Sequence, residues 1–385
     1  MTNRSSRFMQ GALFLAPIII SLLISALLVI AVGRDPFEVA QLILEGAFRN
    51  NRSFAGVLNF FISLTLVSMG LVVTFRAGLW NIGVEGQMMM GAVFASIIPM
   101  AFLQNTHLDS NAVPSFLLLL GSVLLAGVGG ILWGLLVGFL KIQLGINEIF
   151  GGVALNALAN VFSIYLISGP WEPDIGGSAQ GTAPFPPATL YPQISNDFPT
   201  SLLALIIVAI AFVAIFFALN GTRWGLNLKA VGKNTRSALL LGVPTRRVAL
   251  SAFVVCGALA GIAGSYRALF TFDSLRPLAS GGIGFLGLLV VLLVSVRALW
   301  VPIIAFAFAA ILSGSTRLRI SLQLDSSLAS VLQGTLVLLV LLFKGVREVW
   351  GSRIAGDGED SADQQRSVEA QDNQQSFNTQ GDLSA

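Results

Sequence analysis

Residues 116–140, FLLLLGSVLLAGVGGILWGLLVGFL, form a continuous apolar run without a charged side chain. About 20 consecutive apolar residues suffice for a helix to cross the roughly 30 Å hydrocarbon core of a bilayer. Residues 8–32 form a second run of the same kind. These runs predict membrane-spanning helices.

The composition of the whole chain agrees with this prediction. Of its 385 residues, 55% are hydrophobic and 11% are charged, and the mean hydropathy is +0.82. Soluble domains carry about 25% charged residues, so a soluble fold is excluded. We therefore predict an all-α integral membrane protein with about ten transmembrane helices. The expected spans lie near residues 8–32, 57–75, 86–103, 115–140, 148–167, 200–219, 249–270, 282–296, 299–313 and 328–343.

Three of these runs are short for a straight crossing, namely 86–103, 282–296 and 299–313. Non-helical backbone is tolerated at membrane depth only where protein or a water-filled cavity surrounds it. We therefore expect some broken or re-entrant spans at these three places. An even number of spans puts both termini on one side of the membrane.

Charged residues orient the spans, because cytoplasmic connectors carry an excess of Lys and Arg. The connector 220–248 holds six basic residues and no acidic one. Nine of the eleven acidic residues before Lys344 fall on the opposite connectors. The basic connector and both termini are therefore expected in the cytoplasm.

The chain is expected to have two parts. Residues 1–353 hold the transmembrane domain, and residues 354–385 contain seven acidic residues, one arginine and almost no large apolar side chain. A segment of that composition cannot bury enough apolar surface to fold, so we expect a disordered acidic tail on the cytoplasmic side.

Several kinds of chemistry are excluded by composition. The chain has one cysteine, Cys256, and one histidine, His107, so an internal disulfide, a cysteine metal cluster, a histidine zinc site and a serine-type triad are all ruled out. It also lacks the G-x-x-x-x-G-K-[ST] phosphate-binding loop. We expect no catalytic residue, no metal and no cofactor.

The basic connector 220–248 is too long to join two adjacent spans directly. Asn234 can cap a short helix over residues 235–241, and Gly242 suits a left-handed helix end. Three interpretations remain open for this helix: an anchor on anionic lipid, a helix lying in the membrane surface, or a docking helix for a cytoplasmic partner.

Polar residues also stand at the starts of two spans, and an ionised group within a bilayer costs at least about 2.5 kcal/mol. Such groups face the interior of the helix bundle or a water-filled cavity. One interpretation is a gate or a transport path, and the other is simple capping of helix starts near the cytoplasmic surface. The residues concerned are Asn81, Glu85, Gln87, Asn147, Glu148 and Asn156.

Four motifs follow one another along the chain: FRAGLWNIGVEGQMMMG at 75–91, NEIFGGVALN at 147–156, GKNTRSALLLGV at 232–243 and SGGIGFLGLLV at 280–290. In this order they resemble permease subunits of ATP-binding cassette importers for simple sugars, nucleosides and branched-chain amino acids. The resemblance covers roughly residues 8–350. The connector SGPWEPD at 168–174, followed by QGTAP at 180–184, is more similar to nucleoside-type permeases that depend on a basic membrane protein.

The resemblance implies a permease without an ATPase site of its own, in the bacterial cytoplasmic membrane, that translocates a small polar solute such as a nucleoside. Its implied partners are a separate ATPase subunit, a second permease subunit, an extracytoplasmic substrate-binding lipoprotein and membrane lipid; no nucleic acid is expected. Ser237 stands where the docking pattern usually has alanine. The docking residues implied by the match are Gly232, Asn234, Ser237, Ala238 and Gly242.

Alternative functions are a sugar or branched-chain amino acid permease of the same family, or an ion-coupled secondary transporter or channel. The second class usually needs an acidic residue deep in a span, and here Glu85 and Glu148 lie near span ends. An intramembrane enzyme is poorly supported, because no span carries a histidine pair, an acidic pair or a reactive cysteine.

Overall fold

The computed structural model describes residues 29–31, 33–105, 107, 109–173 and 180–322, with isolated positions between 20 and 27 and between 331 and 342. The chain divides into one compact unit over residues 29–334 and a second over residues 1–28 and 335–385. The second unit is described only at isolated helical positions. The predicted spans 8–32 and 328–343 lie largely outside the described residues, and the predicted tail 354–385 lies wholly outside them.

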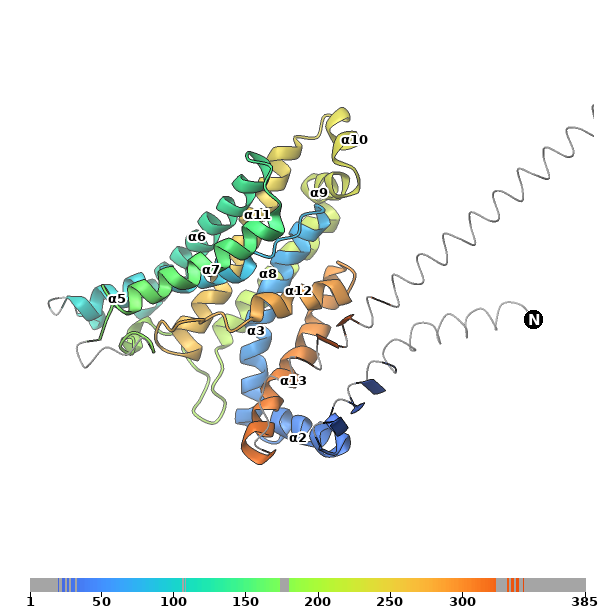
Figure 1. Cartoon of the computed structure of the whole chain (residues 1–385). Helices are drawn as coiled ribbons and strands as arrows, with labels where there is room; N and C mark the ends of the chain where they lie inside the picture. Colours follow the sequence, from blue (N-terminus) through green and yellow to red (C-terminus); the bar gives the residue numbers. More distant parts are fainter. Residues whose placement is uncertain are drawn as a thin grey trace, which may run out of the picture. The chain divides into compact units, whose positions relative to one another are not determined.

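The regular elements of the described residues are all helical (Figure 1). Short 3-10 turns occur at Ser110–Ala112, Pro187–Thr189 and Ala298–Trp300, and a π-helical turn, Arg267–Thr271, extends the helix before it. The α-helices are α2 (Pro36–Phe48), α3 (Asn51–Arg76), α4 (Val84–Ala95), α5 (Ile97–Gln104), α6 (Ser115–Ile142), α7 (Glu148–Ile167), α8 (Leu202–Gly221), α9 (Arg223–Lys233), α10 (Thr235–Leu240), α11 (Thr245–Tyr266), α12 (Ile283–Leu293) and α13 (Val301–Leu322).

Within the described residues, seven helical segments are long and apolar enough to cross a membrane, which confirms the all-helical membrane fold. One of them, Val84–Gln104, combines α4 and α5, which meet at Ser96. The number of about ten spans is not confirmed. The spans found are Asn51–Arg76, Val84–Gln104, Ser115–Ile142, Glu148–Ile167, Leu202–Gly221, Thr245–Thr271 and Ala298–Leu318.

Two of the three runs that were expected to be short for a straight crossing differ from each other in outcome. The run 282–296 holds only α12, whose 11 residues extend about 16 Å, too short for a crossing. It ends because Ser295 and Val296 adopt positive φ angles of 51° and 62°. The run 299–313 was wrongly expected to be short. Its helix continues through polar residues whose hydroxyls bond within the helix, as the Ser315 hydroxyl donates to the Leu312 carbonyl at 2.7 Å.

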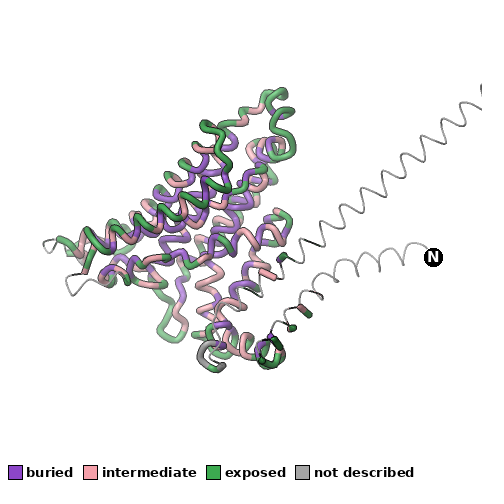
Figure 2. The backbone as a smooth tube through the Cα atoms, in the orientation of Figure 1, coloured by how far each residue is buried: buried purple, intermediate pink, exposed green. Residues whose placement is uncertain are grey.

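The centre of the larger unit is α11, packed against α3, α4 and α6. Small residues make this packing possible, because a methyl group on Gly130 of α6 would overlap the Gly257 carbonyl of α11. Gly91 of α4 meets Gly261 of α11 in the same way. Helices α3, α4 and α11 are mostly buried (Figure 2), whereas α6, α7 and α8 expose most of their apolar length. The exposed apolar faces suit contact with lipid or with another protein chain.

Helix α2 was not predicted from the sequence. It packs on α13, where a methyl group on Gly46 would overlap the Gly314 carbonyl. The Arg317 guanidinium lies 3.4 Å from the Glu45 carboxylate and links the same two helices. The pair therefore places an arginine of a spanning helix beside an acidic partner.

The two ends of the larger unit carry different structures. Helices α9 and α10 lie at the end where α8 finishes and α11 begins (Figure 1). At the other end, residues 180–201 pack on the segment after α11, where the Thr182 amide donates to the Leu275 carbonyl at 2.9 Å. The Tyr191 hydroxyl lies 2.9 Å from the Ser265 hydroxyl, and burial raises the pKa of Tyr191 to about 12. Tyr191 therefore stays a neutral hydrogen-bonding group.

Candidate functional site

The segment 77–83 joins α3 to α4 and is here called the connecting turn. Its residue Asn81 is fully buried and forms two reciprocal hydrogen bonds with Gln87, each 3.1 Å long. The Asn81 amide also lies 3.1 Å from the Cys256 sulfur. Cys256 is 11 residues, or about 16 Å, along α11 from Thr245, so this turn reaches deep into the bundle.

Glu85, in the first turn of α4, bonds to a different helix. Its two carboxylate oxygens accept hydrogen bonds from the backbone amides of Gly282 at 2.8 Å and Gly284 at 2.6 Å. These amides belong to the start of α12, where the helix dipole is positive and favours an anion. The amides and the dipole together offset part of the cost of placing a carboxylate at this depth.

Asn156 of α7 holds the start of α4 from the other side. Its side-chain oxygen accepts from the Gly86 amide at 2.7 Å, and its side-chain nitrogen donates to the Ile82 carbonyl at 2.9 Å. One turn further along α7, the Asn160 oxygen accepts from the Leu278 amide at 3.2 Å. The two asparagines therefore tie α7 to both the connecting turn and the loop before α12.

A cavity of about 370 Å³ lies among these groups. Residues from α4, α7, the loop before α12 and α12 itself surround it. Its lining residues are Glu85, Met89, Asn156, Ala157, Asn160, Leu278, Ser280, Gly281, Gly282 and Phe285. Glu85 is the one ionisable residue among them.

Eight of the ten lining residues were not among the predicted site residues, and four of these eight matter most here: Asn160, Ser280, Gly281 and Gly282. Asn160 could have been found, because it follows Asn156 by four residues and therefore lies on the same helix face. The other three belong to the fourth motif, SGGIGFLGLLV, which was noted for its family resemblance alone. Sequence could not show that this loop returns to the start of α4.

Arg267 was also missed, although it is the one charged residue in the run 249–270. It is buried, and its Nε donates to the Ala279 carbonyl at 3.0 Å. Its guanidinium carbon lies 4.5 Å from the centre of the Phe272 ring and 5.6 Å from that of Phe60. Arg267 therefore stabilises the loop before α12, part of which lines the cavity.

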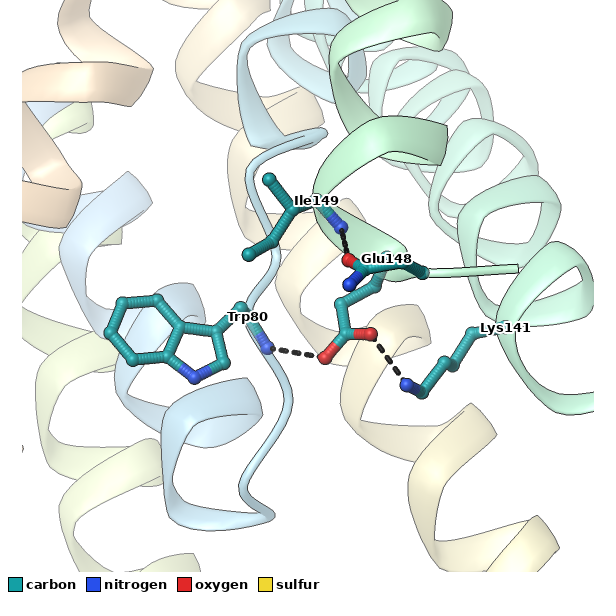
Figure 3. Close-up of polar contacts among 5 residues, drawn as sticks. Trp80, Lys141, Glu148 and Ile149 are labelled. Atoms are coloured by element: carbon teal, nitrogen blue, oxygen red, sulfur yellow. Dashed lines mark hydrogen bonds and ion pairs between the residues drawn. The ribbon is translucent and has the colours of Figure 1, made fainter. Parts of the chain in front are cut away.

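The remaining predicted residues, Asn147 and Glu148, lie apart from the cavity. The Asn147 side chain caps α7 by accepting from the Ile149 amide at 2.9 Å. Figure 3 shows Glu148 between Lys141, at 2.6 Å, and the backbone amide of Trp80, at 3.5 Å. Glu148 therefore fastens the connector between α6 and α7 to the connecting turn.

The predicted short helix in the basic connector is confirmed as α10, although it ends at Leu240. The Asn234 side chain caps it by accepting from the Ser237 amide at 3.0 Å, and Gly242 has a φ of +80°. Ala238 is buried, whereas the side chains of Leu239, Leu240 and Leu241 are 62%, 89% and 81% exposed. These three leucines form an apolar patch, here called the leucine patch.

Gly232, the first of the predicted docking residues, faces a different neighbour. A methyl group there would overlap the Arg76 carbonyl oxygen and lie 3.0 Å from the Ala77 carbonyl carbon. It therefore packs against the connecting turn. Among the described residues, no group of three or more His, Cys, Asp or Glu side chains could hold a metal ion.

Comparison with known proteins gives the family of the chain. A family model described as a branched-chain amino acid transport system permease component matches residues 53–341. A guanosine ABC transporter permease protein of Bacillus subtilis (strain 168) is 27% identical over 344 residues, which are 88% of this chain and 94% of the relative.

Two further relatives have similar identities. A nucleoside ABC transporter permease protein of Lactococcus lactis subsp. cremoris is 26% identical over 78% of this chain and 82% of its own length. A glucose ABC transporter permease protein of Haloferax volcanii is 25% identical over 84% of this chain and 85% of its own length. No solved structure matches the chain significantly.

These matches confirm the resemblance that the four motifs predicted. Permease components of this kind are transport subunits without an ATPase site of their own, and they work with ATPase and substrate-binding partners. The seven helices of the described residues that are long and apolar enough to cross a membrane agree with a multi-pass membrane subunit of an ABC transporter. The matched range therefore shows that the chain belongs to the branched-chain amino acid transport system permease family.

Proposed function

We propose that this permease imports a nucleoside across the bacterial cytoplasmic membrane, and that the cavity beside Glu85 and Asn156 is part of its path. The cavity itself carries the proposal. Its volume of about 370 Å³ lies within the range of small-molecule sites, about 300–1,000 Å³, and polar side chains converge on it among apolar ones. The guanosine and nucleoside permease relatives support the choice of solute.

The charge of the cavity favours a solute without formal charge. A free amino acid carries both an ammonium and a carboxylate group, and each needs an oppositely charged partner away from water. Glu85 is the one ionisable lining residue, and both of its oxygens already accept backbone hydrogen bonds. This favours a nucleoside over a branched-chain amino acid. The glucose permease relative keeps a simple sugar as the second candidate.

The basic end of the bundle supports the orientation with both termini in the cytoplasm. Arg76 and Lys141 end their spans beside the connector 220–248, whose six basic residues stand on α9, α10 and the start of α11. The leucine patch is then a cytoplasmic docking surface for the ATPase subunit. The predicted docking residues Asn234, Ser237, Ala238 and Gly242 shape α10, and the exposed leucines make the contact.

The exposure of the cavity supports a second permease subunit. Asn156 and Asn160 are partly exposed in the middle of a spanning helix, where contact with lipid would be costly. A second permease packed over α7 and α12 would shield them and close the path. Residues 180–201, at the opposite end from α10, would then meet the substrate-binding lipoprotein.

The test is uptake by the complete transporter in vesicles. We expect ATP-dependent, vanadate-sensitive uptake of labelled guanosine that excess unlabelled nucleoside inhibits and excess leucine does not. Asn156→Ala should reduce uptake, whereas Leu158→Ala, an exposed residue on the same helix, serves as the control. Uptake that needs no ATP, or that glucose inhibits and nucleosides do not, would refute the proposal.

A further inference from the structure

The connecting turn lies between the docking helix and the cavity and touches both. Gly232, at the end of α9, packs directly on Arg76, Ala77 and Gly78, and α10 begins two residues after α9 ends. A methyl group on Gly78 would in turn lie 3.2 Å from the Gly232 Cα. The backbone of α9 therefore contacts the backbone of the connecting turn directly, and no flexible side chain lies between them.

Helix α9 can transmit a displacement because it contacts the bundle at both ends. Gly232, at its end, packs on the connecting turn, and two residues at its start contact α11 and α8. The Trp224 indole donates to the Ser251 hydroxyl of α11 at 2.8 Å, and Gly225 packs on the last turn of α8. The Arg76 guanidinium donates to the Asn220 side chain at 3.3 Å. A movement of α10 can therefore reach the bundle through α9 and its contact with the connecting turn, beside the contacts of α9 with α8 and α11.

From the connecting turn, the backbone of residues 78–87 and the hydrogen bonds of Asn81 and Glu85 lead to the cavity. Asn81 is joined to Gln87 by two bonds and to Cys256 by a third, so the turn and the first turn of α4 form one unit. Glu85 in that unit holds the amides of Gly282 and Gly284, which form the wall of the cavity.

We propose that four residues act as positioning residues for transport: Gly232, Gly78 and the buried pair Asn81 and Gln87. They pass the movement of the docking helix to the cavity wall through Glu85. The inference rests on the docking and path roles proposed above. It assigns Gly232 to an internal contact and not to the partner surface. The route is continuous within residues 76–87, and interfaces packed this closely shift as units because they cannot deform gradually.

The experiment separates ATP hydrolysis from solute movement. Gly232→Ala is introduced into the complete transporter in vesicles, and guanosine uptake and ATP hydrolysis are measured on the same sample. We expect the ATPase subunit still to bind, because the leucine patch is unchanged, while uptake per ATP hydrolysed falls about two- to thirtyfold, as for residues that couple distant sites. The matched control is Gly221→Ala, because nothing lies within 4 Å of a methyl group at Gly221.

A second variant, Asn81→Ala, tests the same route without touching α9. It should lower uptake per ATP while leaving binding of the ATPase subunit intact. An assembled transporter of either variant with the wild-type ratio would overturn the inference, as would failure of both variants to assemble, since the contacts would then serve folding alone. Absence of ATP-dependent uptake in the wild-type transporter would instead count against the proposed function.

Discussion

Helices α6 and α11 contact each other at glycines. Two glycines of α6 that lie one turn apart, Gly127 and Gly130, allow a controlled test of that contact. A methyl group on Gly130 would overlap the Gly257 carbonyl oxygen and lie 2.9 Å from the Gly261 Cα. A methyl group on Gly127, which is also buried, would meet nothing within 4 Å. Gly130→Ala and Gly127→Ala therefore add the same atoms to the same helix, with and without a clash.

The expected difference follows from two known effects. Forcing extra volume into a packed core costs about 1–3 kcal/mol. Alanine in place of glycine at a compatible position stabilises a protein by about 0.4–1 kcal/mol, because the unfolded chain loses freedom. Gly130→Ala should therefore lower the free energy of unfolding, and Gly127→Ala should raise it slightly. Because the chain-entropy gain is common to both, the two variants should differ by the cost of the clash, about 1–3 kcal/mol.

Cys256 supplies the assay, because it is the one cysteine of the chain and is fully buried beside Gly257. A thiol-reactive dye should label it in detergent only when α11 separates from its neighbours on heating. We expect the labelling midpoint of Gly130→Ala to fall by several degrees and that of Gly127→Ala to stay at or above the wild-type value. Equal midpoints for the two variants would refute the close contact between α6 and α11.

Three further predictions concern polar and exposed residues. Leu240→Glu should abolish co-purification of the ATPase subunit yet leave the dye-labelling midpoint unchanged, because this leucine is 89% exposed; a stable complex would exclude the leucine patch as the docking surface. Glu85→Gln should destabilise the protein by about 1–3 kcal/mol, seen in the same midpoint, because an amide can accept from one of the two amides of α12 and leaves the other unpaired; a wild-type midpoint would contradict this bonding. Glu148→Gln and Lys141→Met, alone and combined, should show a coupling energy of about 1 kcal/mol in a double-mutant cycle, and additive effects would mean that the ion pair does not contribute.

Much of the fold follows from apolar runs. The predicted spans 115–140 and 148–167 match α6 and α7 to within two residues, because a bilayer demands long uninterrupted apolar helices. The capped helix after Asn234 was predictable for a local reason, since the side chain that caps it lies next to it in the sequence. Gly130, Gly134, Gly257 and Gly261 recur at a four-residue spacing that is typical of closely packed helices, but the spacing alone does not say that α6 and α11 pack on each other.

The site was predictable only in part. Asn81, Glu85 and Gln87 stood out as polar groups at a span start. However, Asn81 also meets Cys256, 175 residues away, and Glu85 meets the start of α12, 197 and 199 residues away. Capping was one of the two interpretations of Glu85, and the helix that Glu85 caps is not its own. Hydropathy gives no signal for this, because α12 is as apolar as a full span and differs from one in length alone.

The position of Glu85 is related to the place where the short helix α12 begins, because Glu85 accepts hydrogen bonds from the first amides of α12. A helix that begins within a packed bundle exposes its first amides, and the loop before it has irregular backbone; both are costly where water is excluded. Three polar side chains from three other elements meet this need: Glu85 accepts from Gly282 and Gly284, Asn160 accepts from Leu278, and Arg267 donates to Ala279.

Each of these side chains would be unfavourable against lipid on its own, and the loop would be unfavourable without them. Because all four bonds end on the same seven residues, 278–284, a shift of α4, α7 or α11 changes the support of the whole loop at once. The wall of the cavity is therefore tied to α4, α7 and α11 by hydrogen bonds, in addition to the packing of α12 on α3. In the proposed transport path, a relative shift of these helices would change the shape of the cavity, as a path needs if the solute is to be admitted in one state and released in another.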